Sequence, residues 1–351
     1  MEQILHSKPW ITEVDIAKVT EVLASSMLGQ GNSVRQLERR LAEWLHAADG
    51  VAVGSGSAGI VLALHGIGVK SNDDVILPSY VCRSVVEAVL AIGARPVLCD
   101  VGSDWVMTAY DASRVLTSRT RAIVAPHMYG IFADIDELRS LGVPIIEDCA
   151  QAVDAKGARV TQADVTVLSF HPTKCFTAAE GGMVLSSNSE ALARMRTYRD
   201  GNVDESAVYS ARLFSPLSDV AAGLALSQLD HYELGLACRR EISAKYLAIV
   251  ESCCPSAINH SALGRSMFFR LPLHLPGGLA ACQDDFAKFG VQVRRGVDEL
   301  LHRRMGLPDT KFPNAVKHFE TTVSLPIYPA LTDNQISRCL EAAKHVLPRF
   351  H

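Results

Sequence analysis

The sequence lacks several features that mark whole classes of protein. Its 351 residues hold 34 basic and 38 acidic side chains, giving a formal net charge of -4. Proteins that bind a nucleic-acid backbone carry a basic stripe or patch, so we expect no nucleic-acid partner. No apolar run approaches the roughly 20 residues that cross a bilayer, and the opening MEQILHSKPW lacks the basic-then-apolar pattern of a secretion signal. We therefore expect a cytoplasmic protein without a membrane partner.

The cysteines lack the spacing of a metal site or a disulfide scaffold. There are nine, an odd number, and no two of them form a C-x-x-C pair. Zinc sites and disulfide frameworks depend on regular cysteine spacing. We therefore expect no metal site, and we predict that most of the thiols are reduced, buried, small apolar side chains.

The chain does contain an alternation of strand-like and helix-like segments. Continuous apolar runs are typical of strands buried on both faces, as in a mainly parallel sheet flanked by helices. The expected strands are 51–53, 75–79, 96–100, 122–126, 144–148, 165–170 and 182–187. Apolar residues at three- and four-residue intervals predict helices, among them 12–26, 33–47, 218–250, 280–289 and 333–346.

The length favours two domains, because 351 residues exceed what one core usually supports. We predict a large α/β domain at 1–235, which includes an N-terminal helical segment. A smaller C-terminal α+β domain is expected at 236–351, with short strands in 268–273 and 291–295.

One glycine-rich turn follows the first expected strand. The stretch 51–59, VAVGSGSAG, has the G-x-G-x-x-G spacing of dinucleotide sites. Such a site also needs an acid at the end of the second strand to bind the ribose, but that strand ends VILPSY. A P-loop is excluded because no Gly-Lys-Ser/Thr follows. The turn is therefore predicted to hold one phosphate-sized anion at a helix N-terminus.

Two downstream residues indicate which ligand carries this phosphate. Ligands of such sheets lie beyond the carboxyl ends of the strands; Asp148 ends one expected strand, and Lys174 follows another. A carboxylate there can pair with a protonated pyridine nitrogen, and a lysine can form a Schiff base with an aldehyde. Together they indicate pyridoxal phosphate. The alternatives are that Asp148 only caps a helix beginning AQA, and that Lys174 is a solvated surface lysine.

Nine stretches of the chain carry a resemblance to one family: LGQG (28–31), SGSA (55–58), GARPVLCDV (93–101), HMYG (127–130), PIIEDCAQA (144–152), SFHPTK (169–174), EGG (180–182), FPNA (312–315) and SLPIYPALTD (324–333). Through them the chain resembles, over nearly its whole length, the DegT/DnrJ/EryC1/StrS family of pyridoxal-phosphate-dependent sugar aminotransferases. The pair EDCAQA and SFHPTK is the most specific. The resemblance implies the type I aminotransferase fold, pyridoxal 5'-phosphate as cofactor, and a homodimer with active sites at its interface, which LGQG would help to build.

The resemblance also implies roles for single residues. Lys174 would bind the cofactor as a Schiff base and transfer protons, and Asp148 would pair with the pyridine nitrogen. Gln151 would hydrogen-bond near the phenolic oxygen.

The phosphate would be held largely by backbone N–H groups of Gly56, Ser57 and Ala58, with a hydroxyl from Ser169. Ser57 is alternatively only the N-cap of the helix that begins there. Gly54 and Gly59 would be turn and packing residues.

Two positions depart from the family pattern. The family usually places an aromatic residue over the pyridine ring four residues after the proline that ends the second strand. Here that position is Cys82, and Tyr80 is the nearest aromatic residue, so either of them is a candidate to cover the ring. The family also shows Asn-x-Arg/Lys-Met before the long helix. This chain has FSPLSD at 214–219 instead, which argues against a phosphate contact from the partner's loop.

Four further polar residues have both a functional and a structural interpretation. His127 either points into the site or is a satisfied histidine at a strand end. His171 either contacts the phosphate or shapes its loop. Glu180 is predicted to be a turn or packing residue, and Tyr328 either lines the substrate entrance or belongs to the core.

These observations predict a transaminase that moves an amino group from an amino acid, by resemblance glutamate, to a keto-sugar that is nucleotide-linked. A cyclitol aminotransferase, and a cofactor-binding regulatory homologue with weak turnover, are the alternatives. Sugar dehydratases of the same family carry histidine in place of the lysine, so Lys174 argues against that activity.

Overall fold

The computed structural model describes residues 2–153, 163–201 and 212–351. Its centre is a seven-stranded sheet, made of β1 (Asp49–Val53), β2 (Asp74–Pro78), β3 (Arg95–Cys99), β4 (Thr120–Pro126), β5 (Ile145–Asp148), β6 (Val165–Ser169) and β7 (Gly182–Ser186). The strand order is β1-β7-β6-β5-β4-β2-β3. β7 is antiparallel to both of its neighbours, and the other strand pairs are parallel. The predicted mainly parallel sheet is therefore confirmed.

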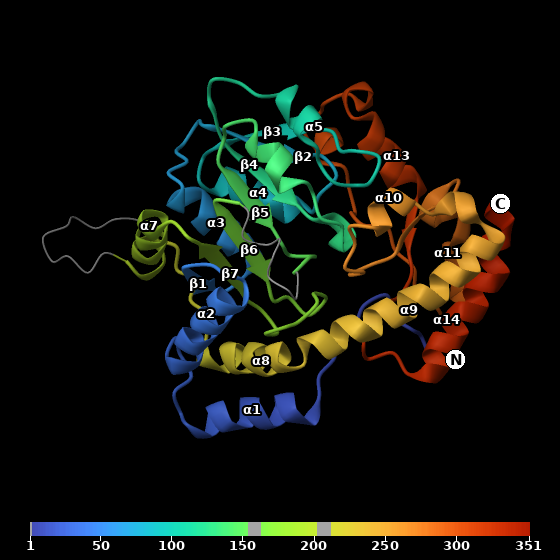
Figure 1. Cartoon of the computed structure of the whole chain (residues 1–351), viewed down its shortest axis with the longest axis horizontal. Helices are drawn as coiled ribbons and strands as arrows, with labels where there is room; N and C mark the ends of the chain where they lie inside the picture. Colours follow the sequence, from blue (N-terminus) through green and yellow to red (C-terminus); the bar gives the residue numbers. More distant parts are fainter. Residues whose placement is uncertain (1, 154–162, 202–211) are drawn as a thin grey trace, which may run out of the picture.

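Helices cover both faces of this sheet (Figure 1). On one face α3 (Gly56–Gly66), α4 (Arg83–Ala91) and α7 (Ser189–Asp200) pack over side chains such as Val51 and Val53. The other face is covered by α2 (Asn32–Trp44), α8 (Asp219–Asp230), α5 (Ala109–Ser113) and α6 (Ile135–Arg139). Because successive residues of a strand point to opposite faces, a strand buried on both sides must be apolar throughout, as the sequence shows.

The predicted long helix 218–250 is two helices. Ser218 caps α8 by accepting a hydrogen bond from the Ala221 amide, and α8 ends at Asp230. His231 leaves helical geometry, with φ -117° and ψ 17°, before α9 (Tyr232–Cys253) begins. The apolar spacing continues across this break, so periodicity alone did not reveal it. In Figure 1, α9 runs from the sheet towards the C-terminal part of the chain.

The C-terminal part packs α9 against α11 (Gly278–Lys288), α14 (Asp333–Val346) and a two-stranded antiparallel sheet of β8 (Pro272–His274) and β9 (Thr322–Ser324). The predicted strand 291–295 is wrong. That segment makes only two isolated bridges, Ile4 with Val291 and Arg294 with Ser324. Of 268–273, only its last two residues are in a strand, because β8 begins at Pro272.

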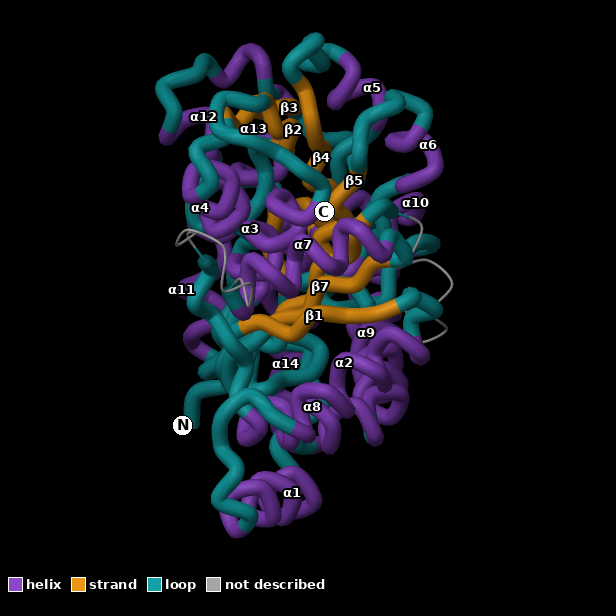
Figure 2. Tube along the Cα trace, turned by 90° about the vertical axis from the view of Figure 1, so that its left-hand side faces the viewer, coloured by secondary structure: helices purple, strands orange, loops and turns teal. Residues whose placement is uncertain are grey.

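Four further α-helices belong to the described chain. They are α10 (His260–Leu263), α12 (Leu301–Arg304) and α13 (Pro313–Thr321), together with α1 (Glu13–Ala24), which packs beneath α8 at the edge of the molecule (Figures 1 and 2). In the part of the chain that the structure describes, no helix combines the length and apolar character needed to cross a membrane.

Two hydrophobic cores support a domain boundary near residue 235, which we propose. Tyr232 and Leu236 at the start of α9 belong to the core beneath the large sheet, whereas Ile242 and Tyr246 belong to the core of the C-terminal part. Ile4 also packs into the latter core. The N-terminal segment therefore returns to the C-terminal part of the chain, and both termini lie there in Figure 1.

Candidate active site

The turn after β1 forms the N-terminus of α3. Ser55 is the N-cap, because its side chain accepts a hydrogen bond from the Ala58 amide at 3.1 Å. The alternative that Ser57 is the cap is therefore corrected to Ser55. Within the described chain, the amides of Gly56 and Ser57 have no hydrogen-bond acceptor. Two free N–H groups at the positive end of a helix dipole form a binding site for an anion.

Gly56 is fixed by a close approach between α3 and β6. A Cβ added to Gly56 would lie 2.8 Å from the Ser169 Cβ and 3.1 Å from its Oγ. This contact brings the Ser169 hydroxyl beside the helix N-terminus. Gly59 packs similarly, since an added Cβ would lie 2.9 Å from a Val167 methyl group. The glycine spacing of this turn therefore follows from helix-to-sheet packing.

We expect Gly56→Ala to destabilise the cofactor-free protein by about 1–3 kcal/mol, the usual cost of overpacking. The measurement is urea unfolding of the variant and of the wild type. Ser169→Gly removes the opposing Cβ, so the double variant should recover most of the loss. A loss of the same size in the double variant would contradict the steric explanation.

Asp148 ends β5 with a buried carboxylate. Its Oδ1 accepts a hydrogen bond from the Ala150 amide at 3.0 Å, and among the described residues its Oδ2 has no partner. Burial raises the pKa of Asp148, while the Ala150 amide, Lys174 and His127 oppose the rise. Residues 149–153 form no helix. The interpretation of Asp148 as a helix cap at AQA is therefore wrong.

Lys174 lies in the turn after β6. Its backbone amide donates to the His171 carbonyl at 2.9 Å, and its Nζ has no hydrogen bond or ion pair with any described residue. Burial lowers the pKa of Lys174, whereas the charge of Asp148 raises it and that of Arg270 lowers it. Lys174 is only partly exposed, lines the cavity and has a lowered pKa, which contradicts its interpretation as a solvated surface lysine.

Gln151 is held against the turn after β4. Its Oε1 accepts a hydrogen bond from the Tyr129 amide at 2.8 Å. Tyr129 has a positive φ of 60°, which a bulky residue rarely adopts, and its carbonyl accepts a hydrogen bond from the Arg270 amide at 3.1 Å. The Gln151 carboxamide is thereby fixed at the cavity wall.

Cys82 lies at the wall of the cavity, and Tyr80 does not. Cys82 precedes α4, its side chain is exposed, and the Ser84 hydroxyl lies 3.3 Å from its Sγ. Tyr80 is fully buried, with its hydroxyl 2.8 Å from that of Tyr129. The structure thus leaves Cys82 as the candidate to cover a ring. All nine cysteines are free and five are buried, as predicted for most of them.

One cavity of about 490 Å³ collects most of the predicted site. Its wall includes Gly56, Ser57, Cys82, Asp148, Gln151, Ser169 and Lys174. Ala58 is buried in α3 outside this wall, and its amide is taken by Ser55. The cavity lies at the carboxyl ends of β1, β4, β5 and β6, because these strands share one direction in the sheet.

The remaining candidates divide between cavity and core. His127, His171 and Glu180 line the cavity, whereas Tyr328 is buried in the core of the C-terminal part. His127 is satisfied: its Nε2 lies 2.7 Å from Glu147 and its Nδ1 accepts from the Ala133 amide. Although His127, Glu147 and Cys149 lie close enough to share an ion, these bonds already use both histidine nitrogens.

Several cavity residues were not singled out from the sequence, among them Met128 and Asp298. Met128 follows His127 in the HMYG stretch, and Asp298 comes from the C-terminal part of the chain. The stretch VQVRRGVDEL around Asp298 matches no motif. Only the packing of the C-terminal part against the large sheet places that carboxylate at the site.

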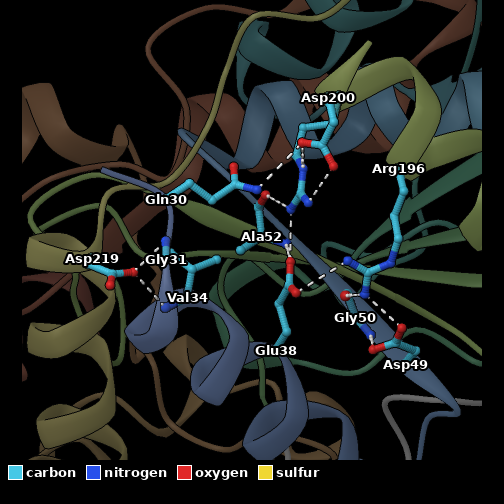
Figure 3. Close-up of polar contacts among 11 residues, drawn as sticks. Gln30, Gly31, Val34, Glu38, Asp49, Gly50, Ala52, Arg196, Asp200 and Asp219 are labelled. Atoms are coloured by element: carbon cyan, nitrogen blue, oxygen red, sulfur yellow. Dashed lines mark hydrogen bonds and ion pairs between the residues drawn. The ribbon is translucent and has the colours of Figure 1, made fainter. Parts of the chain in front are cut away.

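The loop 212–219 lies against the site of its own chain. The Ser215 carbonyl accepts a hydrogen bond from the Gly54 amide at 2.9 Å, and Phe214 is 75% exposed. The Asp219 carboxylate accepts hydrogen bonds from the amides of Gly31 and Val34 (Figure 3). This carboxylate therefore ties the LGQG stretch to the start of α8.

The donor set of the cavity fits pyridoxal phosphate. The free amides of Gly56 and Ser57, with the Ser169 hydroxyl, suit its phosphate. The unpartnered Asp148 oxygen suits a cationic ring nitrogen, and the Lys174 amine suits an aldehyde. The volume is within the range of cofactor and ligand pockets.

Comparisons with known proteins point the same way. The model of the DegT/DnrJ/EryC1/StrS aminotransferase family matches residues 9–344. Among solved structures, Spr1654 from Streptococcus pneumoniae in its PMP form is 24% identical, with 99% of this chain and 98% of that chain covered and a TM-score of 0.88. PseC from Helicobacter pylori, an aminotransferase involved in the biosynthesis of pseudoaminic acid, is 20% identical over all of both chains, with a TM-score of 0.87. The aminotransferase TlmJ from Streptoalloteichus hindustanus is 27% identical over 96% and 97% of the two chains, with a TM-score of 0.86.

Proposed function

Because the chain belongs to the DegT/DnrJ/EryC1/StrS aminotransferase family, we propose that it transfers the amino group of glutamate to a nucleotide-linked keto-sugar. It has the type I fold of these enzymes, and pyridoxal 5'-phosphate is its cofactor. The donor, the acceptor and the roles of single residues are our proposals. The observation that carries them is the cavity that joins Lys174, Asp148 and the free amides of α3.

Bound pyridoxal phosphate supplies an aldehyde that takes up the amino group and a ring that withdraws electrons from it. The residues of this chain bind, orient and transfer protons. Gly56, Ser57 and Ser169 hold the phosphate, and Gln151 hydrogen-bonds near the phenolic oxygen. Cys82 covers the ring in place of an aromatic side chain. Ala58 does not line the cavity, so in our proposal it packs in α3 and does not contact the phosphate.

Lys174 and Asp148 divide the proton chemistry between them. Because burial lowers the pKa of Lys174, its Nζ is more readily neutral, and a neutral amine can attack a carbonyl and accept a proton. Asp148 is acidic and buried, so it is suited to hold a proton at a ring nitrogen. Its pKa is raised by burial before any cation lies beside it, and a cationic partner would lower it again.

The first half of the proposed reaction can be tested alone. Glutamate added to the purified holoenzyme is expected to convert the cofactor to its amine form, which removes the absorbance band near the visible edge. Other common amino acids serve as donors for comparison. If no amino acid produces this change, the chain binds the cofactor without transamination, as the regulatory alternative requires.

The acceptor can then be identified with the amine form of the enzyme. Nucleotide-linked keto-sugars are expected to restore the original band, and keto-cyclitols are not. Restoration by a cyclitol and not by any sugar would favour the cyclitol alternative.

A homodimer is part of the proposal. α1 carries exposed apolar side chains, among them Val14, Ile16 and Leu23, and Met27 and Phe214 are also exposed. Ile16 also lines an apolar groove between α1, α8 and residues 172–179. Residues 172–179 follow His171 and surround Lys174, so a partner seated there would reach the active site. Sedimentation equilibrium tests this, and a mass of 38.0 kDa for the holoenzyme would contradict it.

A further inference from the structure

Three arginines of the described chain are almost completely buried. Arg199 is 4% exposed, Arg239 is 3% exposed and Arg270 is 6% exposed. A buried guanidinium is costly unless a carboxylate and further hydrogen bonds compensate its charge. Such arginines are therefore rare without a partner, and the three differ sharply in this respect.

Arg199 has the expected compensation. Its Nη1 lies 2.8 Å from a Glu38 oxygen and donates to the Ala52 carbonyl, and its Nε lies 2.8 Å from Asp200. Figure 3 shows these three partners, Glu38, Asp200 and Ala52. These carboxylates raise the pKa of Arg199 against the effect of its burial.

Arg239 and Arg270 have no such compensation. Within residues 2–153, 163–201 and 212–351, no acidic side chain forms an ion pair with either of them. Arg239 donates to the carbonyls of Phe269 and Ile327, and its Nε has no hydrogen-bond partner. The Arg270 guanidinium donates to the Ser7 hydroxyl and lies 4.4 Å from the centre of the Phe269 ring. The Arg239 guanidinium lies 5.7 Å from the centre of the same ring, so both guanidinium groups pack around Phe269.

The charges near Arg270 reinforce its positive potential. Burial, together with the positive charges of Arg239 and Arg294, lowers the pKa of Arg270 to about 9. His6, buried close by, has its pKa lowered by burial and by Arg270 and Arg294. No described carboxylate enters this group, so its positive charge remains uncompensated inside the chain.

This group lies behind the wall of the catalytic cavity, whose lining includes Gln151 but not Arg270 itself. The Tyr129 backbone is shared between the two, since its amide donates to Gln151 at the cavity wall and its carbonyl accepts from the Arg270 amide. Arg270 is also close enough to lower the pKa of Lys174 and of Cys175. An anion beside Arg270 would thus lie near the amine that reacts.

We propose that Arg270, supported by Arg239 and Arg294, binds a carboxylate of the amino-acid donor. The proposal rests on the proposed aminotransferase function, in which a donor with at least one carboxylate must approach Lys174. An ionised carboxylate supplies the missing counter-charge, and a guanidinium can bind it through two parallel hydrogen bonds. The same residues explain why the chain tolerates uncompensated buried charge, because substrate sites retain such groups at the expense of stability.

The test uses glutarate, a dicarboxylate without an amino group, bound to the holoenzyme and followed by calorimetry. We expect Arg270→Met to raise the dissociation constant for glutarate at least about tenfold, as for the loss of hydrogen bonds to a charged group. Arg270→Lys keeps the charge and should lose less. Arg240→Met is the matched control, because Arg240 is the exposed neighbour of Arg239 on α9, and it should leave the constant unchanged.

A second measurement separates binding from folding. Without glutarate, the melting temperature of Arg270→Met is expected to equal or exceed that of the wild type, because the variant removes an uncompensated charge. Arg199→Met, which removes one of the two arginine partners of the buried Glu38 and leaves Arg196 as the other, is expected to melt clearly lower. A large fall for Arg270→Met would overturn the proposal in favour of a structural role.

Two other outcomes would also overturn it. One is a glutarate constant within twofold of wild type in Arg270→Met. The other is a loss of uridine diphosphate binding in this variant with glutarate binding intact, which would assign Arg270 to the acceptor. The conversion of the wild-type cofactor by glutamate tests the function separately, so either proposal can fail without the other.

Discussion

Lys174→Ala is expected to abolish covalent attachment of the cofactor and to lower transamination by at least about 10⁴-fold. One positioned acid–base group alone contributes about 10²–10⁴-fold, and Lys174 is proposed to act as a nucleophile as well. The measurement is borohydride reduction of the holoenzyme followed by mass spectrometry of its peptides. Wild type should carry the reduced cofactor on Lys174, and the variant should carry none.

Removal of Lys174 should not harm the fold. The folded state lowers the pKa of this lysine, so its charged form is disfavoured there and its loss costs little stability. Lys245→Ala, on the exposed face of α9, is the control and should keep both label and activity. A label on another lysine in wild type would overturn the assignment. The rate at which the cofactor-free protein forms the Schiff base with added pyridoxal phosphate should rise with pH, with its midpoint below the ordinary lysine value of 10.5.

Asp148→Asn is expected to lower activity by about 10²–10³-fold, the range for loss of one group that stabilises developing charge. The asparagine keeps the size of the side chain and can still accept from the Ala150 amide, but it carries no negative charge. The measurements are the rate of the half-reaction with glutamate and the dissociation constant of the cofactor. Full activity in the variant would show that no anion is needed at this position.

The same substitution should raise the stability of the cofactor-free protein. The folded-state pKa of Asp148 is raised, so the folded chain binds this proton more tightly than the unfolded chain does. Its contribution to stability is therefore present below the ordinary value of 3.8 and is lost as the pH rises through the folded-state pKa. At pH 7 the variant should melt higher than wild type, and the difference should shrink as the pH falls towards 4. A lower melting temperature at pH 7 would contradict this sign.

The main residues of the candidate site could be predicted from the sequence because they lie at or just after the ends of strands. Asp148 and Ser169 end strands and Lys174 lies in the turn after Ser169, and parallel strands bring their carboxyl ends to one edge of the sheet. The same reasoning placed all seven strands. It failed at His231, where the break between α8 and α9 leaves the apolar spacing unchanged, and at 291–295, where β-rich residues form only isolated bridges.

The sequence alone determined the seven strands along the chain, the mainly parallel sheet that they form and most of the residues that meet at its carboxyl edge. These follow from local patterns: buried strands must be apolar on both faces, and a tight strand-to-helix turn requires glycine. The tertiary structure decided the rest. It placed Cys82, and not Tyr80, at the cavity, gave the α3 cap to Ser55, and brought Asp298 to the site. It also buried Arg270 without a carboxylate partner, whereas Arg199 forms ion pairs with two carboxylates. Burial and charge compensation depend on segments far apart in the chain, so no local pattern can reveal them.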